Sequence, residues 1–135
     1  MPLSVYPDLS NPVVLCIDNS QTMLERERAF LESFGCAVLT ASNSGQGLAL
    51  AAVHSVDVVV LADSPAINGQ EVAMEVRRLR PQAPIIMLAE AADVPGPTLN
   101  LVDALVAKNC LDSQLLPAIA QLQGRGGIPL PSYHA

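Results

Sequence analysis

Four apolar runs, each followed by a charged residue, constrain the fold of this chain most strongly. The runs occupy residues 13–17, 58–62, 85–89 and 104–107, and the residues that follow them are Asp18, Asp63, Glu90 and Lys108. Continuous apolar runs of this length are typical of strands buried on both faces, as in a parallel sheet covered by helices. The carboxyl ends of such strands form the ligand crevice. The sequence therefore predicts acids and one lysine at a common edge, which suits a divalent cation and an oxyanion.

Composition limits the class of protein. The chain has 135 residues, half of them hydrophobic, which favours one folded domain with a real core. Its net charge of −6 argues against nucleic-acid binding, which needs a basic stripe. No apolar stretch approaches the ~20 residues that cross a bilayer, and no signal-like segment opens the chain. We therefore expect a cytoplasmic protein that binds neither nucleic acid nor membrane.

Strand and helix patterns alternate along the chain. Strands are predicted at residues 13–17, 36–40, 57–62, 84–89 and 103–107, and helices at 21–34, 44–53, 70–80 and 113–122. This alternation predicts a doubly wound α/β sandwich. Pro95, Gly96 and Pro97 indicate that the helix before the fifth strand is shortened or absent. Residues 1–11 are expected to be a loose lead-in, 12–123 the domain, and 124–135 a flexible tail.

The first predicted helix has an apolar stripe that should face the core. Its members are Met23, Phe30, Leu31 and Phe34. The charged run of residues 25–28 is expected mostly on the solvent face. In the last helix, Pro117 is tolerable near the first turn, where Asp112 or Ser113 as N-cap would place it. Cys16 and Cys36 are expected to be small buried residues inside strands.

Three features resemble a response-regulator receiver domain over residues 12–123. They are Asp18 after an apolar strand, the spacing from Pro65 to Asn68-Gly69, and the lone Lys108 that closes the last strand. The resemblance implies a flavodoxin-like fold with a five-stranded parallel sheet of order 2-1-3-4-5 and helices on both faces. It also implies two-component (phosphorelay) signalling. In that family, a sensor histidine kinase passes a phosphoryl group to an aspartate at the end of the third strand.

The resemblance implies a Mg²⁺ site at Asp18, Asn19 and Asp63, and a phosphate-binding role for Lys108. The family has an acidic pair where this chain has Asp18-Asn19, so cation binding should be weak or absent. Asp63 is the candidate phosphoacceptor, although counting from neighbouring motifs places Leu61 or Ala62 at that position. A shift of one residue along a strand points a side chain to the opposite face. Asp63 could therefore face away from the crevice.

The positions that report phosphorylation in the family are also altered. Ala89 stands where the family has Thr or Ser after the fourth strand, and Leu105 stands where it has an aromatic residue. Both positions are therefore predicted to be degenerate as a switch.

Each candidate site residue keeps a structural alternative. Asp18 binds a cation or only accepts backbone N–H groups in the loop that follows it. Asp63 is a phosphoacceptor or only a loop cap. Lys108 binds a phosphoryl oxygen, or forms an ion pair with Asp18 or Asp63 that holds the site together without phosphate. Glu90 is expected to be a solvated loop acid.

Two functions remain from the sequence. The chain has no phosphate-binding P-loop, no nucleophile elbow and no evident nucleophile–base pair, so we do not expect an enzyme. We favour a receiver-like module that acts by phosphate-independent protein–protein interaction. The alternative is a phosphorylation-switched regulator that uses Asp63 and Mg²⁺. The expected partners are a sensor histidine kinase or another signalling protein. A homodimer is also expected, through an apolar patch left by the shortened helix.

Overall fold

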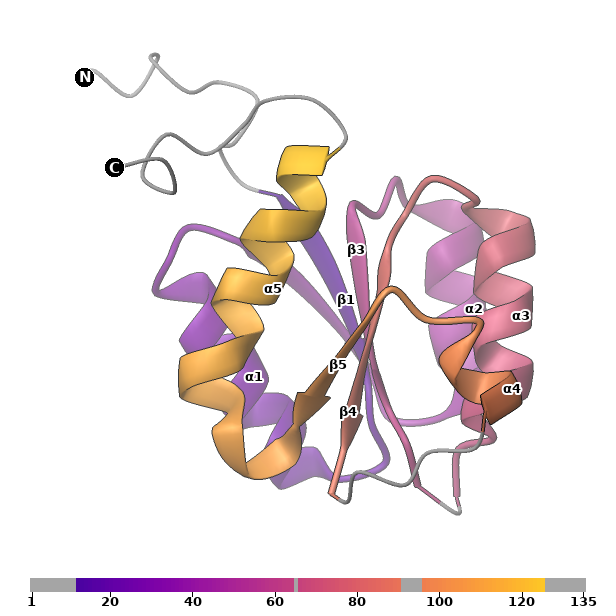
Figure 1. The fold of residues 1–135 in the computed structure, drawn as a ribbon, viewed down its shortest axis with the longest axis horizontal. Coiled ribbons are helices and arrows are strands. Elements are labelled where there is room, and N and C mark those ends of the chain that lie inside the picture. The colour runs from indigo at the N-terminus through magenta and orange to yellow at the C-terminus, as the bar shows by residue number, and fades with distance from the viewer. Residues whose placement is uncertain (1–11, 65, 91–95, 126–135) are drawn as a thin grey trace.

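Five parallel strands form one sheet in the order β2-β1-β3-β4-β5, which confirms the predicted topology (Figure 1). The computed structural model describes residues 12–64, 66–90 and 96–125. The strands are β1 (Val13–Ile17), β2 (Ala37–Ala41), β3 (Val58–Ala62), β4 (Ile85–Ala89) and β5 (Ala104–Ala107). The helices are α1 (Gln21–Glu32), α2 (Ser44–Val53), α3 (Gly69–Leu79), α4 (Gly96–Leu99) and α5 (Leu111–Arg125), with a 3-10 turn at Lys108–Cys110. The predicted lead-in at 1–11 and most of the predicted tail lie outside the described residues.

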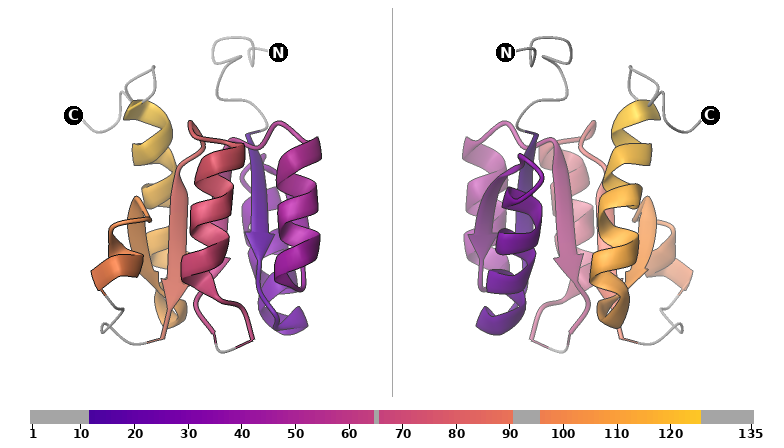
Figure 2. Two further views of the ribbon diagram at one scale, coloured as in Figure 1. Left: turned by 90° about the vertical axis from the view of Figure 1, so that its right-hand side faces the viewer. Right: turned by 90° about the vertical axis from the view of Figure 1, so that its left-hand side faces the viewer.

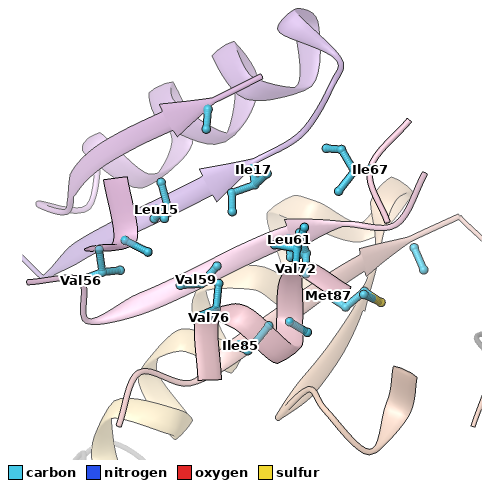
Figure 3. Packing of buried hydrophobic residues seen from close by; sticks show 14 residues of the cluster. Leu15, Ile17, Val56, Val59, Leu61, Ile67, Val72, Val76, Ile85 and Met87 are labelled. Carbon is cyan, nitrogen blue, oxygen red and sulfur yellow. The ribbon is translucent and has the colours of Figure 1, made fainter. Parts of the chain in front are cut away.

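The helices cover both faces of the sheet. α1 and α5 lie on one face, and α2, α3 and α4 lie on the other (Figures 1 and 2). Successive side chains of a strand point to opposite faces, so each apolar run contributes to two cores. Leu15, Leu61 and Met87 pack under α2 and α3 (Figure 3). Cys16 and Val60 pack under α1 and α5. The apolar runs are therefore buried on both faces, as predicted.

In the described part of the connection between β4 and β5, residues 96–103, the one α-helix is the four-residue α4, in agreement with the predicted shortening. An ionic contact fixes this connection to α3. The Arg77 guanidinium donates to the Leu101 carbonyl at 3.1 Å and to Asp103 Oδ2 at 2.7 Å. Asp103 Oδ2 also accepts from the Ile85 N–H at 2.8 Å. Asp103 thus joins α3, the start of β4 and the segment that leads into β5.

Four local predictions were wrong in detail. α1 ends at Glu32, so Phe34 lies beyond the helix and is 57% exposed instead of facing the core. Cys36 is buried as expected, but β2 begins one residue later. α5 begins at Leu111, so Pro117 lies in the helix interior and not in its first turn. A proline there has no N–H for the preceding turn, and packing against the sheet must offset that loss. α5 also continues to residue 125, two residues into the predicted tail.

None of the helices in the described ranges is both long and apolar enough to span a membrane.

Candidate functional site: the pocket at the carboxyl ends of the strands

A pocket of about 630 Å³ opens where β1, β3, β4 and β5 end. Its lining is polar apart from one methionine. The lining residues are Asp18, Asn19, Ser20, Met23, Ser64, Glu90, Lys108 and Asn109. The structure thus brings Asp18, Asn19 and Lys108 together, as the sequence suggested. Glu90 is exposed at the rim, as expected for a solvated acid. Asp63 is not among the lining residues.

Asp18 is buried beneath this pocket, with only 1% of its surface exposed. Its N–H donates to the Ala41 carbonyl at 3.0 Å, and its Oδ1 accepts from the Ser20 N–H at 2.9 Å. The Ser20 hydroxyl in turn caps α1 by accepting from the Met23 N–H at 3.2 Å. Asp18 therefore braces the turn from β1 into α1, which is the structural role considered from the sequence. Its second oxygen, Oδ2, is buried and has no hydrogen-bond partner among the described residues.

The Asp63 carboxylate lies on the other side of the sheet edge, beside the start of α3. A Cβ atom built on Gly69 would lie 3.6 Å from Asp63 Oδ1 and 2.9 Å from the terminal methyl of Met87. Met87 belongs to the core under α2 and α3. The N-terminal end of a helix stabilises a carboxylate through the helix dipole. The Asp63 carboxylate therefore faces away from the pocket, the orientation that the one-residue shift allowed.

Ala62 occupies the position opposite Asp18. The register pairs Ile17 with Leu61, so the next residues along β1 and β3 are Asp18 and Ala62. Alternation along β3 directs Ala62 to the same face as Val60, the face covered by α1 and α5. Asp63 follows with the opposite orientation. A methyl group therefore stands opposite Asp18 at the end of β3.

Direct protein contacts span the mouth of the pocket. The Lys108 ammonium donates to the main-chain carbonyl of Asp63 at 3.4 Å. Among the described residues it forms no ion pair with Asp18 or Asp63, so the predicted ion pair is not observed. The Ser64 hydroxyl donates to Asn19 Oδ1 at 3.0 Å. These two contacts join the loops after β1, β3 and β5 without a ligand.

The residues present do not fit a Mg²⁺ site. Mg²⁺ requires oxygen donors in octahedral geometry, with carboxylates as the charged ligands. Asp18 is the one acid of the predicted set that faces the pocket, and its free oxygen is buried. The amide oxygen of Asn19 is already hydrogen-bonded. Within residues 12–64, 66–90 and 96–125, no three acidic, histidine or cysteine side chains are grouped to hold a metal.

Glu27 is a site residue that the sequence analysis placed wrongly. It was expected mostly on the solvent face of α1, but none of its surface is exposed. Its pKa is raised from 4.5 to about 8, chiefly by burial; the Cys16 thiol acts to lower this pKa, the Asp18 charge acts to raise it, and the Lys108 ammonium acts to lower it. Burial also raises the pKa of the Cys16 thiol, with Glu27 and Asp18 adding to the shift. The gap in the apolar stripe between Met23 and Phe30 was the signal that could have located Glu27.

The two positions predicted to be degenerate as a switch lie at the end of β4 and within β5. Ala89 is 4% exposed and packs in the core under α2 and α3. Leu105 is 39% exposed. Neither side chain carries a group that could hydrogen-bond to an anion in the pocket.

Comparison with known proteins places this fold and pocket in a family. The family model described as the response regulator receiver domain matches residues 14–119. A receiver domain from Clostridium thermocellum is 26% identical and has a TM-score of 0.77, with 88% of this chain and 99% of that chain covered. The response regulator TrrA from Thermotoga maritima, solved in complex with Mg²⁺-BeF, is 26% identical with a TM-score of 0.76, covering 82% and 98%.

Vibrio cholerae CheY4 shares the fold at 22% identity, with a TM-score of 0.76 and coverage of 84% of this chain and 99% of that chain. Among curated proteins, none matches this sequence. The family match covers most of the chain and coincides with the observed sheet order. The chain therefore belongs to the response regulator receiver domain family.

Proposed function

We propose that this receiver domain signals through protein contact, without accepting a phosphoryl group. One observation carries the proposal: the end of β3 presents no carboxylate to Asp18, because Ala62 occupies the opposite position and Asp63 lies beside Gly69. Phosphoryl transfer requires a nucleophilic oxygen in line with the donor, and geometry precedes pKa in choosing it. The family match supports a signalling module of two-component type. The residues of the pocket bear on a separate question, which is whether phosphorylation switches this module.

The pocket contacts support the same proposal. In a phosphorylated receiver, the lysine ammonium would stabilise the added oxygens. Here the Lys108 ammonium donates to the main-chain carbonyl of Asp63, and the Ser64 hydroxyl donates to Asn19 Oδ1. The loops are thus held in one arrangement by internal hydrogen bonds. Ala89 and Leu105 provide no hydroxyl or aromatic ring that could respond to a new anion.

Incubation with acetyl phosphate and Mg²⁺ is expected to leave the mass of the full chain unchanged. The physical reason is that β3 ends without a carboxylate oxygen directed into the pocket, since Ala62 lies opposite Asp18 and Asp63 is not among the lining residues. Ala62→Asp restores such an oxygen opposite Asp18 and within the same pocket, so this variant is expected to gain one labile phosphoryl group. Intact-mass spectrometry measures both results, and circular dichroism confirms that the variant is folded.

Asp63→Ala is the control for the phosphorylation-switched alternative. A labile gain of one phosphoryl group in the wild-type chain that disappears in Asp63→Ala would contradict the proposal and establish Asp63 as the acceptor. Mg²⁺ with beryllium fluoride, which TrrA binds in its solved complex, gives a second probe. The proposal predicts that it leaves the melting temperature of the wild-type chain unchanged.

Leu99 and Leu105 form the candidate partner surface, beside the shortened connection between β4 and β5. Their exposed fractions are 41% and 39%. Leu105 pairs in register with Met87, whose side chain packs under α2 and α3, and α4 lies on that same face of the sheet (Figure 2). Exposed apolar side chains on one face can mark an interaction site. We expect this surface to bind a signalling partner or a second copy of the chain. Light scattering at increasing concentration should show a monomer–dimer equilibrium.

Two substitutions with the same change of charge test that surface. Leu105→Glu is expected to shift the equilibrium to the monomer. Val53→Glu, at an exposed position on α2, is expected to leave it unchanged. A monomer at every concentration would exclude the second copy as the occupant of this surface.

A further inference from the structure

β2 forms one edge of the sheet, and part of its backbone is open on that side. The Ala37 N–H donates to the carbonyl just before β1 at 2.9 Å, and the Ala41 carbonyl accepts from the N–H just after β1 at 3.0 Å. In a parallel pair, alternate residues direct both their N–H and their C=O to the same neighbour. Ala37, Leu39 and Ala41 are therefore the residues bonded to β1. The N–H and C=O groups of Val38 and Thr40 point to the open edge, with no hydrogen-bond partner among the described residues.

The backbone donors that flank this open stretch are already used. The Cys36 N–H donates to a carbonyl of α1 at 3.1 Å, and the Ser42 N–H donates to Gln46 Oε1 at 2.9 Å. At the opposite edge, the Ala107 N–H of β5 donates to Gln114 Oε1 at 3.2 Å. Edge strands are usually protected from pairing by charged side chains or proline, and β2 has neither. β2 therefore offers two donors and two acceptors to an added strand.

Apolar side chains border the open stretch on both faces of the sheet. Val38 and Phe30 lie half-buried against the core on the α1 face. Phe34 is 57% exposed and meets Phe30 edge to face, with ring centroids 5.2 Å apart. Leu39 and Leu48 lie half-buried on the α2 face. Because side chains alternate along a strand, an added strand would place apolar groups against both borders.

The segment that builds this edge carries no formal charge. Residues 33–56, which include all of β2 and α2, contain no Asp, Glu, Lys or Arg, although the whole chain has 13 acidic and 7 basic residues. The net charge of −6 repels acidic partners and attracts basic ones. The complementary occupant is therefore an extended segment that is apolar where it pairs and basic where it leaves the edge.

We propose that the β2 edge binds such a segment of another protein as an added strand. Hydrogen bonds to the backbone of Val38 and Thr40 attach the segment, and the apolar borders select its side chains. The inference goes beyond the proposed function, because β2 and β5 lie at opposite edges of the sheet and the surface at Leu99 and Leu105 is not used.

NMR titration of the full, isotope-labelled chain tests this site with a defined probe. The probe is a short synthetic peptide of alternating valine and threonine with two lysines at each end. At saturation it is expected to shift the amide resonances of Val38 and Thr40 and to slow their hydrogen exchange about tenfold. The same peptide, N-methylated at every valine and threonine, has lost the donors for pairing and is expected not to bind.

Two variants of the edge and one of the opposite edge complete the test. Val38→Pro removes one open donor at a position where an edge strand tolerates proline. Thr40→Lys keeps the backbone donor and places a charge at the edge, so it remains informative if the proline variant does not fold. Each variant is expected to weaken peptide binding at least about tenfold. Leu105→Glu, on β5, is the control and should bind the peptide as the wild-type chain does.

Three results would overturn the inference. The first is the absence of peptide-dependent shifts at Val38 and Thr40, or shifts confined to β5. The second is unchanged affinity in folded Val38→Pro and Thr40→Lys. The third is a concentration-dependent shift of the same amides without peptide, which would assign the edge to a second copy of this chain. The acetyl phosphate experiment does not involve β2, so the failure of either proposal is distinguishable from failure of the other.

Discussion

The free energy of unfolding of this protein is expected to fall by roughly 3–5 kcal/mol between about pH 5 and about pH 9, relative to Glu27→Gln. The expected size follows from a pKa raised from 4.5 to about 8 and ~1.4 kcal/mol per pKa unit. Urea unfolding of both proteins at each pH measures the difference. Glutamine keeps the volume and a donor but cannot ionise, so the comparison isolates the Glu27 proton.

The direction follows from proton linkage. In the unfolded chain, Glu27 loses its proton near its ordinary pKa of 4.5, whereas in the folded protein it keeps the proton up to about pH 8. The folded state therefore binds more protons across this window, and stability decreases as pH rises. The contribution is fully present below pH 4.5 and is lost once the pH passes the folded pKa. Glu27→Gln should accordingly be the more stable protein at the alkaline end.

Glu25→Gln is the control for this experiment. It removes the same formal charge from the same helix at an exposed position, so its stability should follow the wild-type curve. A wild-type curve parallel to that of Glu27→Gln across the whole range would contradict the prediction, because Glu27 would then titrate alike in both states.

Asp103→Ala is expected to destabilise the fold by about 2–3 kcal/mol, the second largest effect. The substitution removes the acceptor for Arg77 Nη2 and for the Ile85 N–H at once. Ile85 is fully buried, so its N–H would be left without a partner. The Arg77 side chain is 33% exposed and can regain water, which limits the loss. Urea unfolding measures the change.

Two variants separate the buried contact from a general effect of charge. Asp103→Asn retains a carbonyl oxygen that can accept from the Ile85 N–H, and it should cost less than alanine. Glu75→Ala breaks the exposed pair between Glu75 and Arg78, whose side chains are 45% and 68% exposed. Exposed pairs contribute little, so a change within about 0.5 kcal/mol is expected. Equal losses in Asp103→Ala and Glu75→Ala would contradict the argument.

The layers could be predicted from sequence because strands buried on both faces leave a strong local pattern, whereas the sheet order followed from the resemblance to receiver domains. The apolar runs that became β1, β3 and β4 have no polar side chain to expose, so they must lie inside a covered sheet. The shortened α4 followed from two prolines and a glycine, which oppose helix formation directly. The interior position of Pro117 was missed because its cost is offset by packing of α5, which no local pattern reports.

The candidate site was predicted less completely. Asp18, Asn19 and Lys108 were placed together correctly because parallel strands end at a common edge. The orientation of Asp63 changes if β3 shifts by one residue against β1. In the structure Ile17 pairs with Leu61, so Ala62 lies opposite Asp18 and Asp63 comes one residue too late to face the pocket. Glu27 was assigned to solvent because charged residues are rarely buried alone. Its burial arises because α1 packs against β1 and the sheet, and the sequence pattern of α1 alone does not report this contact.

The sequence by itself determined the class of fold, the strand order implied by family resemblance, and the residues available at the sheet edge. Those properties follow from hydrophobic pattern and residue chemistry, which are local. Only the tertiary structure decided that Ala62 faces Asp18, that Asp63 lies beside α3, and that Glu27 is buried under the pocket. The physical reason is that side-chain direction and pKa depend on register and burial, and both are set by contacts between segments far apart in the chain.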